Sequence, residues 1–202
     1  IPDGPRQIFA APDHRWALVV GDEWSMVLQL VSSVESVAYA IDVSGNPLSG
    51  AAAVGMTLVG MESPNRIQQF LLQNDRAPRA SRSLALDAPP RSISLNARMS
   101  LGAAVVANSI VLFDPAVMET VGRSLETDET PISAQFLTRE EGEWLVVAVQ
   151  DSRELFLYEA TDPTTLSEIG SLPLDMIPRK FVLYDDLVFA TDGRRVSVFQ
   201  LN

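Results

Sequence analysis

A short pattern recurs five times along this 202-residue chain and restricts its fold more than any single motif does. In each copy an apolar segment is followed by a small or polar residue, then by an acid or amide, then by a second apolar segment. The acid or amide positions, 40, 46, 43 and 41 residues apart, are Asp22, Glu62, Asn108, Asp151 and Asp192. Internal periods of this length are typical of repeat architectures, so the chain is expected to consist of repeated units.

The apolar segments predict strands rather than helices. They are short, and their Val, Ile and Phe residues fit the pleated surface of a sheet. Asp, Asn, Gly and Pro fall between them, where hairpins must turn. A second strand is expected after each copy, at residues 26–31, 67–72, 109–113, 154–158 and 196–201. With an inner strand before the pattern and an outer strand after it, each unit has room for four strands.

Units of about 42 residues with four strands each are typical of β-propeller blades. One such sheet cannot bury both of its faces alone, so blades occur in stacked sets. We therefore predict a single all-β propeller domain with five visible blades, which either close by themselves or belong to a larger or partner-completed propeller. Their expected bounds are residues 5–43, 44–88, 89–129, 130–175 and 176–202. A pair of β-sandwich units built from similar hairpins is the alternative.

A family resemblance supports the propeller. An Asp-Pro pair followed seven residues later by glycine occurs twice, as Asp114-Pro115 with Gly122 and as Asp162-Pro163 with Gly170. Residues 154–172 resemble the LVIVD- and YVTN-type repeats of bacterial propellers, in which a strand ends in an Asp-Pro turn and the outer strand carries a glycine. The resemblance covers residues 90–201 and implies the fold, with little bearing on function. The second unit fits less well, because residues 51–56 predict only a weak inner strand.

The last unit has strands at 179–184, 187–190 and 196–201, and no segment remains for a fourth. Too few residues precede the first inner strand to supply it. An uncovered strand edge is an aggregation risk that natural proteins usually cover. We therefore expect a neighbouring subunit or another protein segment to pair with residues 196–201 by strand addition.

Charge and composition exclude several functions. The 26 acids outnumber the 15 bases, for a net charge of −11, which argues against a nucleic-acid partner. The chain has no cysteine and one histidine, His14, which excludes cysteine and multi-histidine metal sites. We predict no cofactor or metal and no transmembrane segment, and we expect a periplasmic or extracellular location.

Four residues are candidates for binding. Arg66, Arg153 and Arg194 closely follow acids of the repeated pattern, and arginine forks match carboxylate and phosphate groups. Trp24 lies in a predicted turn, where an exposed aromatic side chain could anchor a protein contact. The alternative interpretation is that the arginines form solvated pairs beside turns and that Trp24 packs within its hairpin. Trp16 and Trp144 occupy equivalent positions in two units and are expected to be buried.

The sequence favours a noncatalytic protein. The expected inner strands at residues 7–9, 92–94 and 180–182 carry no acids, and neither a nucleophile elbow nor a P-loop is present. The main prediction is a binding or scaffold propeller that holds a protein partner as a subunit of a larger assembly. The alternative is a hydrolase or lyase of the sugar-lactone hydrolase type that uses carboxylate-bound calcium. A lectin-like propeller is the third possibility.

Overall fold

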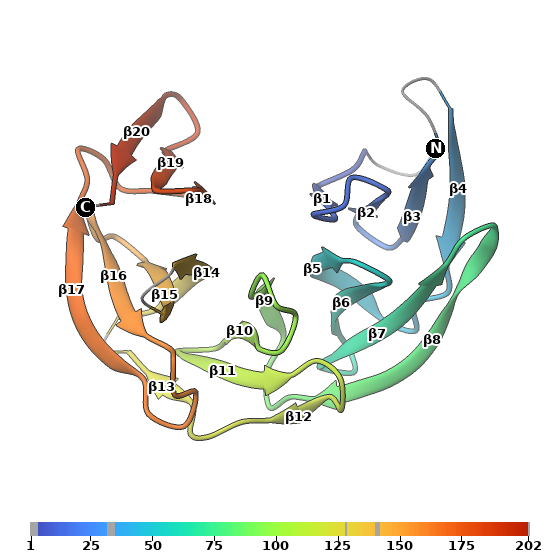
Figure 1. The fold of residues 1–202 in the computed structure, drawn as a ribbon, viewed down its shortest axis with the longest axis horizontal. Helices are drawn as coiled ribbons and strands as arrows, with labels where there is room; N and C mark the ends of the chain where they lie inside the picture. Colours follow the sequence, from blue (N-terminus) through green and yellow to red (C-terminus); the bar gives the residue numbers. More distant parts are fainter. Residues whose placement is uncertain (1–3, 32–34, 128, 140–141, 202) are drawn as a thin grey trace. The chain divides into compact units, whose positions relative to one another are not determined.

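The computed structural model describes residues 4–31, 35–127, 129–139 and 142–201, and these residues form strands, turns and loops. None of the described residues belongs to a helix that could cross a membrane. The strands form five small antiparallel sheets, each built mainly from strands that follow one another in the chain (Figure 1). The all-β fold with one sheet per repeat confirms the predicted propeller blades.

The chain divides into two compact units. The first contains the residues up to Ile93 together with Pro115–Glu119, and the second contains the remainder. The first sheet of the first unit consists of β1 (Gln7–Ala10), β2 (Trp16–Val20), β3 (Ser25–Leu30) and β4 (Ser36–Ile41). The second sheet consists of β5 (Asn46–Ala53), β6 (Met56–Glu62), β7 (Arg66–Gln73) and β8 (Arg76–Ala85).

The remaining three sheets follow the same order. The third contains β9 (Pro90–Leu95), β10 (Gly102–Val106), β11 (Ser109–Asp114), β12 (Glu119–Thr120) and β13 (Leu125–Glu126). The fourth contains β14 (Pro131–Arg139), β15 (Gly142–Val149), β16 (Glu154–Glu159) and β17 (Ser167–Pro173). The fifth contains β18 (Lys180–Tyr184), β19 (Leu187–Thr191) and β20 (Val196–Gln200).

The second sheet, which lies in the first compact unit, corrects one expectation. Its inner strand is β5, which ends at Ala53, whereas the sequence predicted a weak inner strand over residues 51–56. Val54 and Gly55 instead form the turn into β6, and Gly55 has a φ of +74°. A positive φ is easily reached by glycine and rarely by other residues. The end of the strand was difficult to predict from residues 51–53, because these are alanines and alanine favours neither strands nor turns strongly.

The second strand of the fourth sheet, β15, is apolar and buried from Leu145 to Val149 because both of its faces are covered there. In β15, Leu145 and Val147 belong to a core cluster with the third sheet. Val146 and Ala148, which alternate with them, belong to a cluster with the fifth sheet. Side chains of a strand point alternately to its two faces, so the uninterrupted apolar run reflects packing on both sides.

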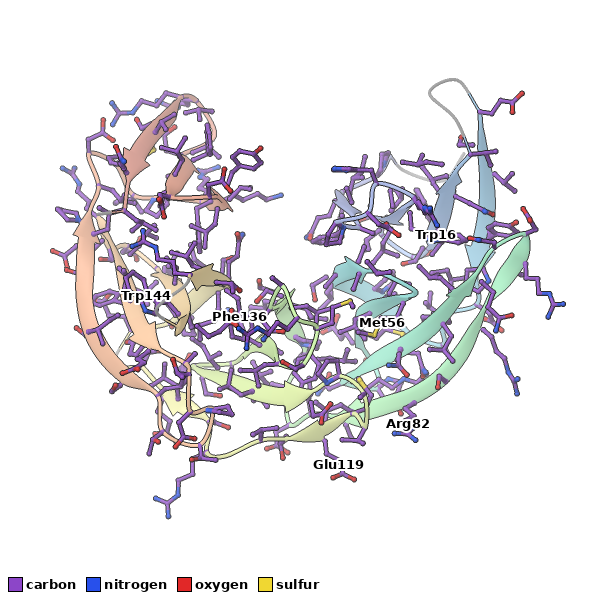
Figure 2. The ribbon with its side chains drawn as sticks, viewed as in Figure 1. Trp16, Met56, Arg82, Glu119, Phe136 and Trp144 are labelled. Atoms are coloured by element: carbon purple, nitrogen blue, oxygen red, sulfur yellow. The ribbon has the colours of Figure 1, made fainter. Side chains whose placement is uncertain are left out.

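The two predicted core tryptophans, both labelled in Figure 2, differ in burial. Trp16 is 3% exposed and packs in the core of the first unit, as predicted. Trp144 is only half-buried at the edge of the cluster between the fourth and fifth sheets, so the expectation of full burial is wrong. It lies near the end of β15 at which the β14–β15 hairpin turns, where fewer neighbours can cover it.

Side chains also connect successive inner strands through backbone groups. In the first unit the Gln7 side chain donates to the Leu48 carbonyl at 3.2 Å, and the Ser49 hydroxyl donates to the Pro90 carbonyl at 2.7 Å. In the second unit the Gln135 amide bridges β14 and β18. It donates to the Phe181 carbonyl at 2.7 Å and accepts the Leu183 N–H at 3.2 Å. These bonds satisfy polar groups between sheets that share no ladder.

The fifth sheet has three strands in the described part of the chain, as the sequence predicted, and β20 is its outer strand. One of its faces packs on the fourth sheet through Phe181, Val188 and Ala190. The opposite face carries exposed apolar side chains, namely Val182, Tyr184, Val196 and Val198. What pairs with β20 or covers this face stays a prediction.

Candidate functional site

A hollow of about 550 Å³ lies in the second unit, at one end of the fourth and fifth sheets. We call it the arginine hollow. Its charged lining residues are Arg179, Arg194, Asp151 and Asp192, and Gln150 adds an amide. The remaining wall is apolar and consists of Ile132, Ile177 and Pro178. Small-molecule sites typically combine this size with apolar walls and a few polar groups.

Strand direction explains why these residues meet. An inner strand begins at the same end of its sheet where the antiparallel second strand ends. Ile132 lies at the start of β14, and Asp151 follows the end of β15. In the fifth sheet Arg179 directly precedes β18, and Asp192 directly follows β19. The hollow is therefore formed by two entry segments and two turns, which the sheets hold in place.

The backbones of the two lining arginines are fixed by hydrogen bonds. The Arg179 N–H donates to the Thr191 carbonyl at 2.7 Å, and the Arg194 N–H donates to a carboxylate oxygen of Asp192 at 2.8 Å. Neither guanidinium forms an ion pair with a carboxylate of the described residues. Both positive groups are therefore available to an anion that enters the hollow.

The carboxylate of Asp192 accepts hydrogen bonds from the backbone of its own turn. Its Oδ1 accepts the N–H of Arg194 at 2.8 Å and that of Arg195 at 3.0 Å. The hydrogen bond from the Arg194 backbone, followed by that from Arg195, lowers the pKa of Asp192 below its usual value because both favour the charged carboxylate. Asp192 thus serves the turn, which is the role that the sequence pattern suggested for these acids.

Asp151 lies in the equivalent turn of the fourth sheet, and its carboxylate accepts fewer hydrogen bonds than that of Asp192. It is exposed, has a φ of +61°, and accepts one long hydrogen bond of 3.4 Å from the Gln150 side chain. The Glu154 N–H donates to the Ser152 hydroxyl at 3.1 Å. Asp151 and Asp192 both line the arginine hollow, so these two turn acids share one face, as predicted.

The four predicted binding residues lie in different places. Arg194 lines the arginine hollow, whereas Arg153 is exposed in the turn after β15 and is not part of the lining. Arg66 and Trp24 belong to the first unit. Arg66 donates from Nη2 to the Ser44 hydroxyl. Trp24 is half-buried, and its indole packs against Gly21 of the same hairpin.

Sequence reasoning missed Arg179 and Gln150. Arg179 was assigned to the inner strand at residues 179–184, but β18 begins one residue later, at Lys180. The signal that could have found it is its position just before an inner strand, at the same end of the sheet as the turn acids. Arg6 has the same position in the first sheet, where it forms an ion pair with Asp22.

The described residues do not fit a calcium site. They contain no group of three or more Asp, Glu, His or Cys side chains that could hold a metal ion, whereas calcium takes six to eight oxygen ligands. In the arginine hollow, one of the two carboxylates is already bonded within its turn. The calcium-dependent form of the hydrolase prediction therefore has no support in the described part of the chain.

Comparison with solved structures shows a similarity in fold. No protein-family model and no curated protein matches the chain. Its structure is similar to the crystal structure of a putative 6-phosphogluconolactonase from Bacteroides uniformis ATCC 8492, with a TM-score of 0.74 and 14% sequence identity. The chain has a five-blade β-propeller fold. The similarity covers 97% of this chain and 66% of the other, so the chain spans slightly under two thirds of that protein.

This likeness corrects the functional prediction. The sequence favoured a noncatalytic scaffold that holds a protein partner, but the similar structure is that of a protein described as an enzyme. The likeness therefore favours the enzyme alternative over the scaffold. The sequence argument against an enzyme considered acids on the inner strands only. The charged groups of the arginine hollow lie instead in the turns and in the segments that precede the inner strands.

Proposed function

We propose that the propeller is a hydrolase that opens the lactone ring of an anionic sugar, and that the arginine hollow is its site. One observation carries this proposal. Two guanidiniums without a carboxylate partner among the described residues line a hollow of about 550 Å³ beside a carboxylate and an apolar wall. The name of the similar structure suggests the substrate class, a phosphorylated sugar lactone.

The charges divide the hollow into two functional parts. Arg179 and Arg194 supply paired N–H donors that match the oxygens of a phosphate. Ile132, Ile177 and Pro178 offer an apolar surface for the C–H face of a sugar ring. Holding the phosphate would fix the position of the lactone carbonyl, and such positioning is itself a large part of catalysis.

The reaction requires little beyond positioning and proton transfer. A water oxygen bonds to the lactone carbonyl carbon and loses a proton, the bond from that carbon to the ring oxygen breaks, and the ring oxygen takes up a proton. The product is an open-chain hydroxy acid. An ionised carboxylate beside the bound lactone would accept the proton of the attacking water as a general base.

A comparison of two substrates tests the proposal. The chain should hydrolyse 6-phosphogluconolactone with a kcat/KM at least about 100-fold above that for uncharged gluconolactone, because charge-assisted hydrogen bonds to the phosphate contribute about 1.5–3 kcal/mol each. Ring opening is followed by continuous titration of the acid released, with spontaneous hydrolysis subtracted. Equal rates for both lactones, or no rate above the spontaneous one, would contradict the proposal.

We also infer that the repeats belong to the LVIVD and YVTN class. Hydrogen bonds to Asp162 stabilise the Asp162-Pro163 turn on which the resemblance rests. Asp162 accepts the Thr164 N–H at 2.9 Å and the Thr164 hydroxyl at 2.6 Å, which makes this Asp-Pro turn self-supporting. If an Asp162→Ala variant unfolds at the same temperature as the wild type, these bonds do not stabilise the turn and no longer favour the assignment to this repeat class.

A further inference from the structure

The turns at Asp151 and Asp192 occupy the same place in two successive repeats but use their carboxylates differently. In the β19–β20 turn one oxygen of Asp192 accepts two backbone N–H groups. In the β15–β16 turn the Ser152 hydroxyl accepts the Glu154 N–H. The strand registers pair Ala148 with Leu155 and Thr191 with Val196, so Asp151 corresponds to Gly193 and occupies a different position of its turn from Asp192. The Asp151 carboxylate lines the arginine hollow and accepts one long hydrogen bond from the Gln150 side chain.

The surroundings of Asp151 suit a proton acceptor. The charged groups that line the hollow with it are Arg179, Arg194 and Asp192. None of the guanidiniums pairs with Asp151, so its oxygens can accept hydrogen bonds from water. The long 3.4 Å bond from the Gln150 amide can orient the carboxylate without occupying both oxygens. An ionised carboxylate accepts hydrogen bonds through several lone pairs.

From this contrast we propose that Asp151 is the general base of the arginine hollow. This inference rests on the proposed lactone hydrolase function. The Asp151 carboxylate takes a proton from the attacking water as the water oxygen bonds to the lactone carbonyl carbon. The same proton then passes to the ring oxygen as its bond to that carbon breaks, which returns Asp151 to its charged form. Asp192 remains a turn residue throughout, and Gln150 is a positioning residue.

The test uses the full chain, two substitutions at position 151 and one matched control. Asp151→Asn keeps the shape of the side chain and tolerates a positive φ, and Asp151→Ala leaves space for a small carboxylate. Asp185 is the control site. It is exposed, has a φ of +51° and lies in the β18–β19 hairpin at the opposite end of the fifth sheet. Asp185→Asn should retain the wild-type kcat.

Asp151→Asn should lower kcat on 6-phosphogluconolactone by about 10²- to 10⁴-fold, the usual contribution of a general base, with KM changed by less than about 3-fold. Added formate should restore part of the rate of Asp151→Ala and leave the wild type and Asp185→Asn unchanged. Thermal unfolding of each variant shows whether it is folded. Formate rescue is the decisive readout, because a merely structural aspartate would not respond to it.

The outcomes separate the two proposals. A wild-type chain that does not hydrolyse the lactone overturns the proposed function, and the assignment of Asp151 with it. An active wild type whose Asp151→Asn variant is equally fast overturns only the assignment of the base. A slow, folded Asp151→Ala variant that formate does not restore also overturns that assignment and leaves the hydrolase function standing.

Discussion

The guanidinium of Arg139 lies over the indole ring of Trp144, 4.6 Å from the ring centre. Both residues belong to the β14–β15 hairpin, and Trp144 is labelled in Figure 2. Nη2 of the same arginine pairs with a carboxylate oxygen of Asp186 at 2.8 Å and donates to the Leu201 carbonyl at 2.8 Å. Stacked on Trp144, Arg139 therefore connects the fourth sheet to both a hairpin turn and the end of the last strand of the fifth sheet.

The first prediction concerns this connection. Arg139→Ala should destabilise the protein by about 1–3 kcal/mol, because it removes hydrogen bonds to a charged donor together with a cation–π contact. Arg139→Lys should recover only part of this, since lysine lacks the planar fork. Urea unfolding measures both. A wild-type unfolding midpoint for Arg139→Ala would show that the contacts contribute nothing to stability.

The second prediction compares the two faces of the fifth sheet. Val188 is fully buried against the fourth sheet, whereas Val182 on the opposite face is 58% exposed. Val188→Ala should cost about 2 kcal/mol through lost burial and a small cavity, and Val182→Ala should stay within about 0.5 kcal/mol of the wild type. A large loss for Val182→Ala in denaturant unfolding would mean that something covers this face.

The third prediction explains a glycine of the repeated Asp-Pro pattern. Gly122 has a φ of +67°, and a Cβ there would lie 2.7 Å from the Pro163 carbonyl oxygen. Gly122→Ala should therefore destabilise the protein more than Gly55→Ala, which shares a positive φ of +74° but has open space around it. The backbone strain of about 1 kcal/mol is common to both. Equal shifts in thermal unfolding would mean that the Gly122 loop relaxes without cost.

The fourth prediction is a pH dependence. Hydrogen bonds from the backbone of Arg194 and Arg195 lower the pKa of Asp192 in the folded state. A lowered folded pKa contributes stability that is present above the unfolded pKa of about 3.9 and is lost as pH falls through the folded value. Asp192→Ala should therefore be less stable than the wild type at pH 7, and the difference should shrink below about pH 4. A difference that is independent of pH would contradict this assignment.

The repeat made the strands predictable. Each strand expected after the repeated pattern is present, and its ends differ from the predicted ones by one or two residues at most. An example is β7 (Arg66–Gln73), which was predicted at residues 67–72. The inner strand β5 was predicted too late in the sequence, at residues 51–56, because Asn46–Ala53 contains Pro, Gly and alanines, which carry little strand signal. Its stability comes from pairing with β6 and not from its own propensity.

The arginine hollow was harder to predict than the fold. Arg194 and the turn acids were visible as a pattern in the sequence. The different hydrogen bonding of Asp151 and Asp192 was not, because it depends on the strand register, which places Asp192 first in its turn and Asp151 second. Likewise, only the structure shows that Arg195 rather than Arg194 contacts Asp175, at 3.4 Å.

The most direct test of the central claim is the kcat/KM for 6-phosphogluconolactone of a variant that carries both Arg179→Gln and Arg194→Gln. Arg153→Gln serves as the control, since Arg153 is exposed and outside the hollow lining. We predict a loss of at least about 100-fold for the double variant, from two charge-assisted bonds to phosphate, and wild-type activity for the control. A folded double variant with wild-type kcat/KM would show that the arginine hollow is not the site of the reaction.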